Sequence, residues 1–168
     1  MERSGLPDNV LAFNLNEPME LDIFPNEDIL FIERKGAIKL FKKGADSVKL
    51  VTTFPVHSEL EDGLLGFAID PDYASNHWVY LFYSPVGDEP KQHLSRFTFE
   101  GDSLHYASEK VLLTVPTQRQ ECCHSAGSVE FGPDRLLYVS LGDNTSPRAT
   151  GYGPIDEGEG RSPWDAQK

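Results

Sequence analysis

Residues 63–83, GLLGFAIDPDYASNHWVYLFY, decide the fold class, because they hold two apolar runs with a turn signal between them. The second run, Trp78-Val79-Tyr80-Leu81-Phe82-Tyr83, has the length and the aromatic, β-branched composition of a strand. Asp70-Pro71-Asp72 predicts a turn, since proline presets φ and an Asp side chain can hydrogen-bond the local backbone. The stretch therefore predicts two β-strands joined by a turn.

The same unit occurs three times along the chain. Pro25, Pro71 and Pro133 each precede an Asn or Asp and then an apolar strand, and they lie 46 and 62 residues apart. These periods are in the range of a propeller blade with loop insertions. Helical periodicity is almost absent, and candidate strands fall at 20–24, 29–33, 37–41, 49–54, 65–69, 79–83, 94–99, 110–115, 128–131 and 136–141. Four strands a unit predict an all-β fold of β-propeller blades.

The repeats fill about two and a half blades, whereas a propeller closes with about four to eight. We place blade 1 at about 11–56, blade 2 at about 60–116, the start of blade 3 at about 121–143 and an irregular loop at 144–168. A half-built blade leaves an unpaired strand edge, which natural proteins avoid. We therefore expect an N-terminal piece of a longer propeller; a complete small β-sandwich is the alternative, but it leaves the repeat unexplained.

Charge and hydropathy exclude several classes of protein. The 168 residues include 15 basic and 27 acidic side chains, a net charge of −12 that argues against a nucleic-acid or anionic-membrane surface. No stretch approaches the roughly 20 apolar residues of a membrane span, and no secretory signal pattern opens the sequence. The only cysteines, Cys122 and Cys123, are adjacent and cannot staple distant segments.

His124 is the strongest candidate for a catalytic group, because its loop leads into the innermost strand of the third unit and so faces the central channel. An imidazole can accept a proton at neutral pH, as a general base must. Asp143 follows nineteen residues later, after a hairpin that returns to the same rim, where its carboxylate could orient the imidazole. Alternatively, His124 caps the backbone and Asp143 only makes a turn.

Two further signals leave alternatives open. Glu61 and Asp62 precede the second unit as His124 precedes the third, so both are candidates to face the channel; a solvated acidic turn is the alternative. Cys122 and Cys123 could form a vicinal disulfide or remain two thiols. A zinc site is unfavoured, because the two cysteines and His124 are consecutive and no second cysteine pair completes a tetrahedral shell.

Three stretches together resemble the glucose/sorbosone dehydrogenases: EDGLLGFAIDP at 61–71, Ser95-Arg96-Phe97, and HSAGSVEFGPDRLLYVSLGD at 124–143. Members of that family are soluble six-bladed propellers that use pyrroloquinoline quinone (PQQ). Residues 151–168 resemble a bacterial branch in which the propeller often lies within a long multidomain chain. The resemblance covers nearly the whole sequence.

The resemblance implies roles for individual residues. His124 matches the general base that removes the sugar hydroxyl proton while hydride passes to the quinone, and Asp143 matches its hydrogen-bonding partner. Glu61 matches a sugar-holding position that is commonly Gln in the glucose enzyme, with Asp62 beside it, so the substrate preference is open. Cys123 stands where Asp is frequent. The PQQ and calcium ligands come from later blades, so we expect them beyond residue 168 and assign no metal ligand here.

By resemblance, the chain is a fragment of a PQQ-dependent sugar or alcohol dehydrogenase of the periplasm or cell exterior. A sugar or polyol would be its substrate, the missing blades its structural partners, and a protein such as a cytochrome its electron acceptor. Alone, the chain is expected to be inactive. One alternative is a calcium-dependent propeller lactonase with Glu61 or Asp62 as metal ligands and a metal-activated water. The other is a propeller binding module that has lost its cofactor site.

Overall fold

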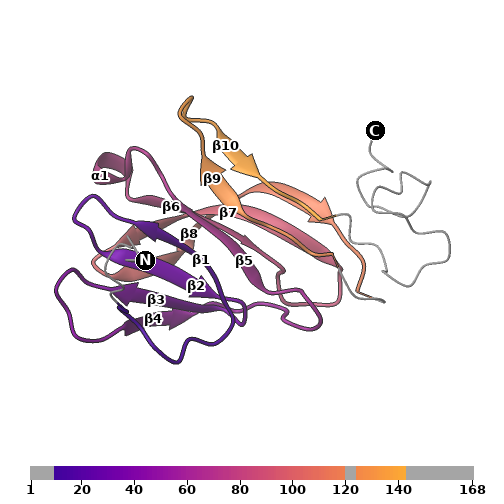
Figure 1. Cartoon of the computed structure of the whole chain (residues 1–168). Coiled ribbons are helices and arrows are strands. Elements are labelled where there is room, and N and C mark those ends of the chain that lie inside the picture. Colours follow the sequence, from indigo (N-terminus) through magenta and orange to yellow (C-terminus); the bar gives the residue numbers. More distant parts are fainter. Residues whose placement is uncertain (1–9, 120–123, 143–168) are drawn as a thin grey trace, which may run out of the picture.

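A computed structural model describes residues 10–119 and 124–142 of the chain (Figure 1). The elements in order are β1 (Pro18–Ile23), β2 (Ile29–Glu33), β3 (Ala37–Phe41), β4 (Lys49–Thr53), β5 (Leu64–Ile69), α1 (Tyr73–Asn76), β6 (Trp78–Tyr83), β7 (Lys91–Glu100), β8 (Ser103–Pro116), β9 (Val129–Phe131) and β10 (Leu137–Val139). Strands β1–β4 form one four-stranded antiparallel sheet and β5–β8 a second, while β9 and β10 pair as a hairpin. The all-β prediction is confirmed: each four-stranded meander is a propeller blade, and the hairpin begins a third.

The strand predictions agree best where a strand is apolar on both faces. Strands β2 and β3 have the predicted limits, and β5 and β6 differ from theirs by one residue at the start. The largest difference is β8, which begins at Ser103, because its first half is mostly exposed and contains no continuous apolar run, although Leu104 is buried there.

The Asx turns form at the first and third repeats by the predicted mechanism. Asn26 Oδ1 accepts the backbone N–H of Asp28 at 3.1 Å, and Asp134 Oδ1 accepts that of Leu136 at 3.1 Å. In both, the side chain replaces a backbone acceptor two residues before the donor, which fixes the turn.

The second repeat differs, since Asp72 precedes the one-turn helix α1, which the sequence did not predict. Here Asp70 supplies the acceptor: its Oδ1 receives the Asp72 backbone N–H at 2.8 Å. The Asp72 side chain instead pairs with Arg135 of the β9–β10 turn, which joins the tips of blades 2 and 3. No helix in the described ranges has the length and apolar character needed to cross a membrane.

Two apolar cores lie between the blades. Between blades 1 and 2, the ring of Phe54 makes edge contacts with Tyr83 and Phe97, at centroid distances of 4.8 and 5.4 Å. Between blade 2 and the hairpin, Tyr80 meets Phe131 edge-on at 5.3 Å. The blades are thus held face to face by buried aromatic contacts, and these set the positions of the loops at their ends.

The innermost strands of the three units run side by side in the same direction. Glu20 and Asp22 on β1 bond to the backbone of Phe67 and Ile69 on β5, a constant offset of 47 residues that only parallel strands give. The starts of β5 and β9 therefore lie at one end of the molecule. Glu61 and His124, which precede those strands, are brought to that same end.

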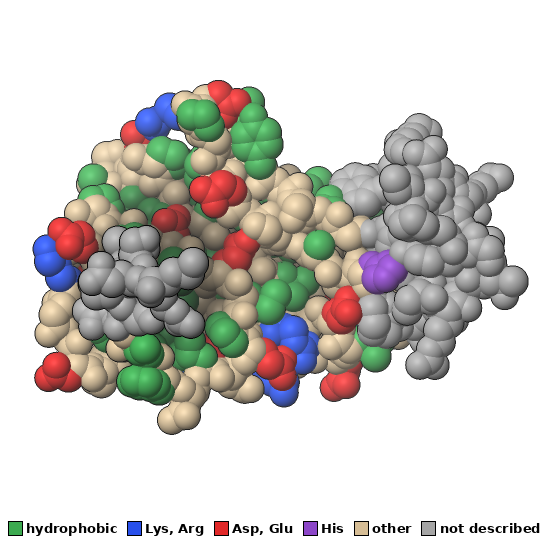
Figure 2. Space-filling model, viewed as in Figure 1, with side chains coloured by type: hydrophobic (Ala, Val, Ile, Leu, Met, Phe, Trp, Pro, Cys, Tyr) green, Lys and Arg blue, Asp and Glu red, His purple; other side chains and the backbone are tan. Residues whose placement is uncertain are grey.

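The face of β1 opposite to Glu20 and Asp22 is largely exposed among the described residues. Met19, Leu21 and Ile23 alternate with the two acids on β1, and Leu21 is 62% exposed. An apolar groove of about 240 Å³ is lined by Met19 and Leu21, together with Leu11 and Leu15. Figure 2 shows hydrophobic side chains on the part of the surface that Figure 1 assigns to blade 1.

Candidate functional site

The loops that precede β5 and β9 meet through a hydrogen bond. Glu61 Oε2 accepts the backbone N–H of Ser125 at 3.0 Å, and both residues are half-buried. Ser125 directly follows His124, so the carboxylate before blade 2 fixes the backbone next to the candidate base. The structure thus brings together the Glu61 and His124 segments that the sequence placed at the same rim.

Gly142 supports the His124 loop from the other side. A Cβ at Gly142 would stand 1.7 Å from the His124 carbonyl oxygen, so only glycine allows this approach. His124 itself has a left-handed backbone, with φ of +63°, which is uncommon for a residue with a side chain. Asp143, the predicted partner of His124, follows Gly142 but lies outside the described residues, as do Cys122 and Cys123.

Gly66 and Gly127, which belong to the stretches 61–71 and 124–143 quoted above, are required by a second close approach of the backbone. A Cβ at Gly66 would lie 1.9 Å from the Gly127 carbonyl oxygen, and one at Gly127 would lie 2.4 Å from the Phe82 ring. The backbone after His124 is therefore packed directly on β5. This contact fixes the distance between the loop of the third unit and strand β5 of blade 2.

Asp62 lies in a buried ion pair. Its side chain is 7% exposed, and Oδ2 accepts the Arg119 Nε–H at 3.0 Å, with His57 Nε2 at 3.8 Å. Arg119 also donates to the carbonyl oxygens of Pro85 and Gly87, at 3.2 and 2.7 Å. This ties the Glu61–Asp62 loop to the β6–β7 connection, and the role of Asp62 toward a substrate stays a prediction.

Arg34 holds the same loop from blade 1. Its Nη1 donates to the carbonyl oxygens of Ser58 and Asp62, at 2.9 and 2.7 Å, and its Nε donates to Glu17 at 2.5 Å. Neither arginine was predicted as part of the site from the sequence. Their partners are backbone carbonyls or carboxylates that lie 17 and 57 positions away, and neither kind of partner leaves a local sequence signal.

The two arginines beside the Glu61 loop are not available to a quinone that carries three carboxylates. Such a ligand needs cationic donors, and both arginines beside the Glu61 loop are already bound to carboxylates and carbonyls. No group of three or more His, Cys, Asp or Glu within ranges 10–119 and 124–142 could hold a metal ion. The candidate functional groups of this part of the chain are therefore the His124 imidazole and the Glu61 carboxylate, on loops whose backbones are fixed by the contacts described above.

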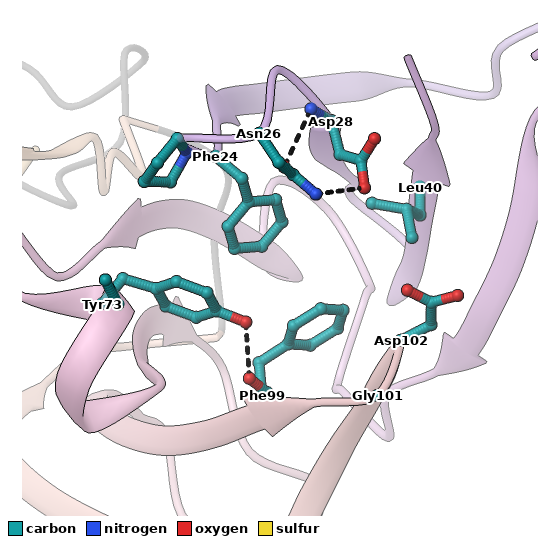
Figure 3. Close-up of a pocket in the computed structure, with 10 residues that line it drawn as sticks. Phe24, Asn26, Asp28, Leu40, Tyr73, Phe99, Gly101 and Asp102 are labelled. Carbon is teal, nitrogen blue, oxygen red and sulfur yellow. Dashed lines mark hydrogen bonds between the residues drawn. The ribbon is translucent and has the colours of Figure 1, made fainter. Parts of the chain in front are cut away.

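A cavity of about 300 Å³ lies at the other end of the inner strands, among Phe24, Tyr73 and Phe99 (Figure 3). The Tyr73 hydroxyl donates to the Phe99 carbonyl at 2.6 Å, and burial, followed by the charges of Glu100 and Asp102, raises the pKa of Tyr73 to about 12. Asp102 on its rim is paired with Lys42 at 2.6 Å. The cavity is thus remote from His124, and these polar groups already have partners.

Comparison with known proteins agrees with this architecture. Residues 15–155 match the family model described as Glucose / Sorbosone dehydrogenase. The chain is 30% identical to quinoprotein glucose dehydrogenase B of Acinetobacter calcoaceticus, over 80% of this chain and 30% of that one. It is 27% identical to the aldose sugar dehydrogenase YliI of Escherichia coli, over 80% of this chain and 38% of that one.

Among solved structures, the PQQ-bound form of an aldose sugar dehydrogenase from Streptomyces coelicolor superposes with a TM-score of 0.70 and 25% identity. The match covers 92% of this chain and 51% of that one. The chain spans about a third of the length of the curated relatives it matches. With the family model matched over 15–155, the chain belongs to the glucose/sorbosone dehydrogenase family.

Proposed function

We propose that this chain forms the sugar-facing rim of a PQQ-dependent sugar dehydrogenase, as part of a longer propeller. The single observation that carries the proposal is the hydrogen bond from the Ser125 backbone N–H to Glu61, which fixes the loop of the candidate base. The family membership and the names of the relatives, a quinoprotein and an aldose sugar dehydrogenase, support it.

His124 acts as the general base. A ring nitrogen of His124 accepts the proton of a sugar hydroxyl as the carbon that bears this hydroxyl is oxidised. PQQ, when bound, supplies the acceptor for the hydride that leaves that carbon. Asp143, one residue after the Gly142 that packs on His124, stabilises the imidazolium that results.

Glu61 orients the sugar. Its Oε2 is occupied by the Ser125 N–H, whereas Oε1 makes no hydrogen bond within the described ranges and so can accept one from a sugar hydroxyl. Asp62 has a supporting role, because its carboxylate is held by Arg119. A carboxylate that only accepts hydrogen bonds favours hydroxyl-rich neutral sugars or polyols over sugar acids.

Further blades of the complete protein hold PQQ and calcium and cover the exposed β1 face. An external electron acceptor such as a cytochrome reoxidises the cofactor, and the complete protein acts in the periplasm or outside the cell, a proposal that has only the family resemblance behind it. The lactonase alternative is less well supported, because Asp62 is held by Arg119, and the carboxylate of Glu61 alone supplies too few of the roughly six to eight oxygen ligands that calcium takes.

The test is a titration of the complete protein with PQQ and calcium, followed by dye-linked oxidation of a panel of aldoses and polyols. We expect saturable quinone binding and turnover that depends on it. A folded complete protein that binds no quinone would contradict the proposal and leave the lactonase or binding-module functions. Sugar lactones, offered with calcium alone, identify the first of these.

A further inference from the structure

One carboxylate links the innermost strands of all three units. Glu20, on β1, accepts through Oε2 the backbone N–H of Phe67 on β5 at 2.7 Å and that of Val129 on β9 at 3.3 Å. Glu20 therefore contacts blade 2 and the third unit from blade 1.

Strand geometry explains why an acid is needed here. β5 pairs with β6 along one edge, and the N–H groups of Phe67 and Ile69, two residues apart, point away from that edge. Glu20 and Asp22, also two residues apart on one face of β1, accept these two N–H groups at 2.7 and 2.9 Å. The two side chains thus take the place of a neighbouring strand.

Only Glu20 extends to the third unit. The residue of β5 before Phe67 is Gly66, which has no side chain and is packed against Gly127. The β9 strand therefore comes close enough for one carboxylate oxygen to bond both Phe67 and Val129. Asp22 bonds to Ile69 and to its own neighbour Ile23, but not to β9 in the described residues.

The surroundings of the Glu20 carboxylate disfavour its charged form. Burial raises the pKa of Glu20, although the hydrogen bonds from Ser128, Phe67 and Val129 act in the opposite direction, and the charge of Glu130 on β9 adds to the rise. No described cation pairs with Glu20. Because burial disfavours the charged form of Glu20, the presence of an acid here is better explained by the positions that its hydrogen bonds give to β5 and β9 than by a gain in stability.

We propose that Glu20 is a positioning residue for the candidate base, which it places through the backbone of β9; the inference rests on the function proposed above. The segment after His124 is then held at three points: Ser125 by Glu61, Gly127 by Gly66, and Val129 by Glu20. A displacement of a catalytic group by about 1 Å can cost a hundredfold in rate. Loss of the Val129 anchor therefore affects the chemical step more than sugar binding.

Three variants of the complete, cofactor-loaded protein test this: Glu20→Ala, Glu20→Gln and Asp22→Ala. Glu20→Ala should lower kcat for sugar oxidation by about tenfold, with KM changed by less than about twofold. Glu20→Gln should restore kcat to within about threefold, because the amide oxygen accepts the same N–H groups. Asp22→Ala, which removes the neighbouring carboxylate but no contact to β9, should leave kcat unchanged.

Hydrogen exchange gives a readout that needs no activity. Read at single amides, Val129 should exchange faster in Glu20→Ala than in Asp22→Ala, while Ile69 should show the reverse. Equal kcat in Glu20→Ala and wild type, or unchanged exchange at Val129, would overturn the inference. If no variant or wild type oxidises sugars, the proposed function fails, and the exchange pattern alone decides whether Glu20 holds β9.

Discussion

Glu61 Oε2 accepts the backbone N–H of Ser125 at 3.0 Å, across a junction between two blades. A hydrogen bond to a charged acceptor contributes about 1.5–3 kcal/mol and fixes direction as well as distance. This hydrogen bond therefore fixes Glu61, which matches a sugar-holding position in the family, to the loop that carries His124. Substitution of Glu61 or of this loop should affect both sugar binding and the chemical step.

Glu61→Ala should speed exchange of the Ser125 amide and lower kcat/KM for sugars by about tenfold or more, since an anchor and a substrate contact are lost together. Glu61→Gln should retain most of both. The control is Glu59→Ala in the same turn, because the Glu59 side chain is exposed. Hydrogen-exchange mass spectrometry and steady-state kinetics are the measurements, and a Glu61→Ala protein that behaves like Glu59→Ala would contradict the prediction.

Arg119→Met should destabilise the protein by about 3 kcal/mol, because it leaves the carboxylate of Asp62, 7% exposed, without its cation. Adding Asp62→Asn to this variant should restore part of the loss, since the unpaired charge is then gone. Urea denaturation of the single and double variants measures both effects. If the double variant is as unstable as the sum of the singles, the pair is not coupled.

Gly66→Ala should strongly destabilise the blade 2–blade 3 junction, because its Cβ would lie 1.9 Å from the Gly127 carbonyl oxygen. We expect a clear fall in the thermal unfolding midpoint together with loss of sugar oxidation. Gly101→Ala is the control: its Cβ would meet no atom within 4 Å, so it carries only the penalty of a left-handed backbone, about 1 kcal/mol. Similar midpoints for the two variants would show that the close approach does not exist.

Ionisation of Asp70 should make the free energy of unfolding depend on pH in the acid range. Burial acts to raise the pKa of Asp70, but hydrogen bonds from the Asn76 side chain, the Asp72 backbone and the Tyr80 hydroxyl outweigh it and lower that pKa below its ordinary 3.8. A depressed folded-state pKa contributes stability above the unfolded-state value, which is lost as pH falls through the folded-state value.

Asp70→Asn should therefore be less stable than wild type at pH 7, and the difference should shrink progressively below about pH 4. Denaturation midpoints between pH 2.5 and 7 check this. A difference that stays constant over the whole range would mean that ionisation of Asp70 has no part in it. Asp46→Asn is a matched control, because the Asp46 side chain forms no hydrogen bond with another residue of ranges 10–119 and 124–142.

Strand positions were predictable from sequence because an apolar strand is a local pattern. The run from Trp78 to Tyr83 and the Pro-Asx turns needed only neighbouring residues, and the structure confirms them as β6 and as two Asx turns. The start of β8 was not predictable, since the residues from Ser103 to Glu109 form no continuous apolar run and are mostly exposed.

The support of the site was not predictable, because its contacts join residues far apart in sequence. Glu20 alternates with apolar neighbours as in any half-buried strand, and nothing local shows that it bonds to Val129, 109 positions away. Arg119 and Asp62 are 57 positions apart. The motifs indicated His124 and Glu61, whereas the carboxylates and arginines that hold them appear only once the blades are packed.

The central claim is that His124 takes the sugar hydroxyl proton, and the pH dependence of sugar oxidation by the complete protein, reconstituted with PQQ and calcium, tests it most directly. In wild type, kcat should fall on the acid side as one group is protonated. His124→Gln should lower kcat by about 10²–10⁴-fold and abolish that acid limb, with quinone binding retained. A His124→Gln protein that keeps the wild-type profile and a rate within about tenfold would contradict the account.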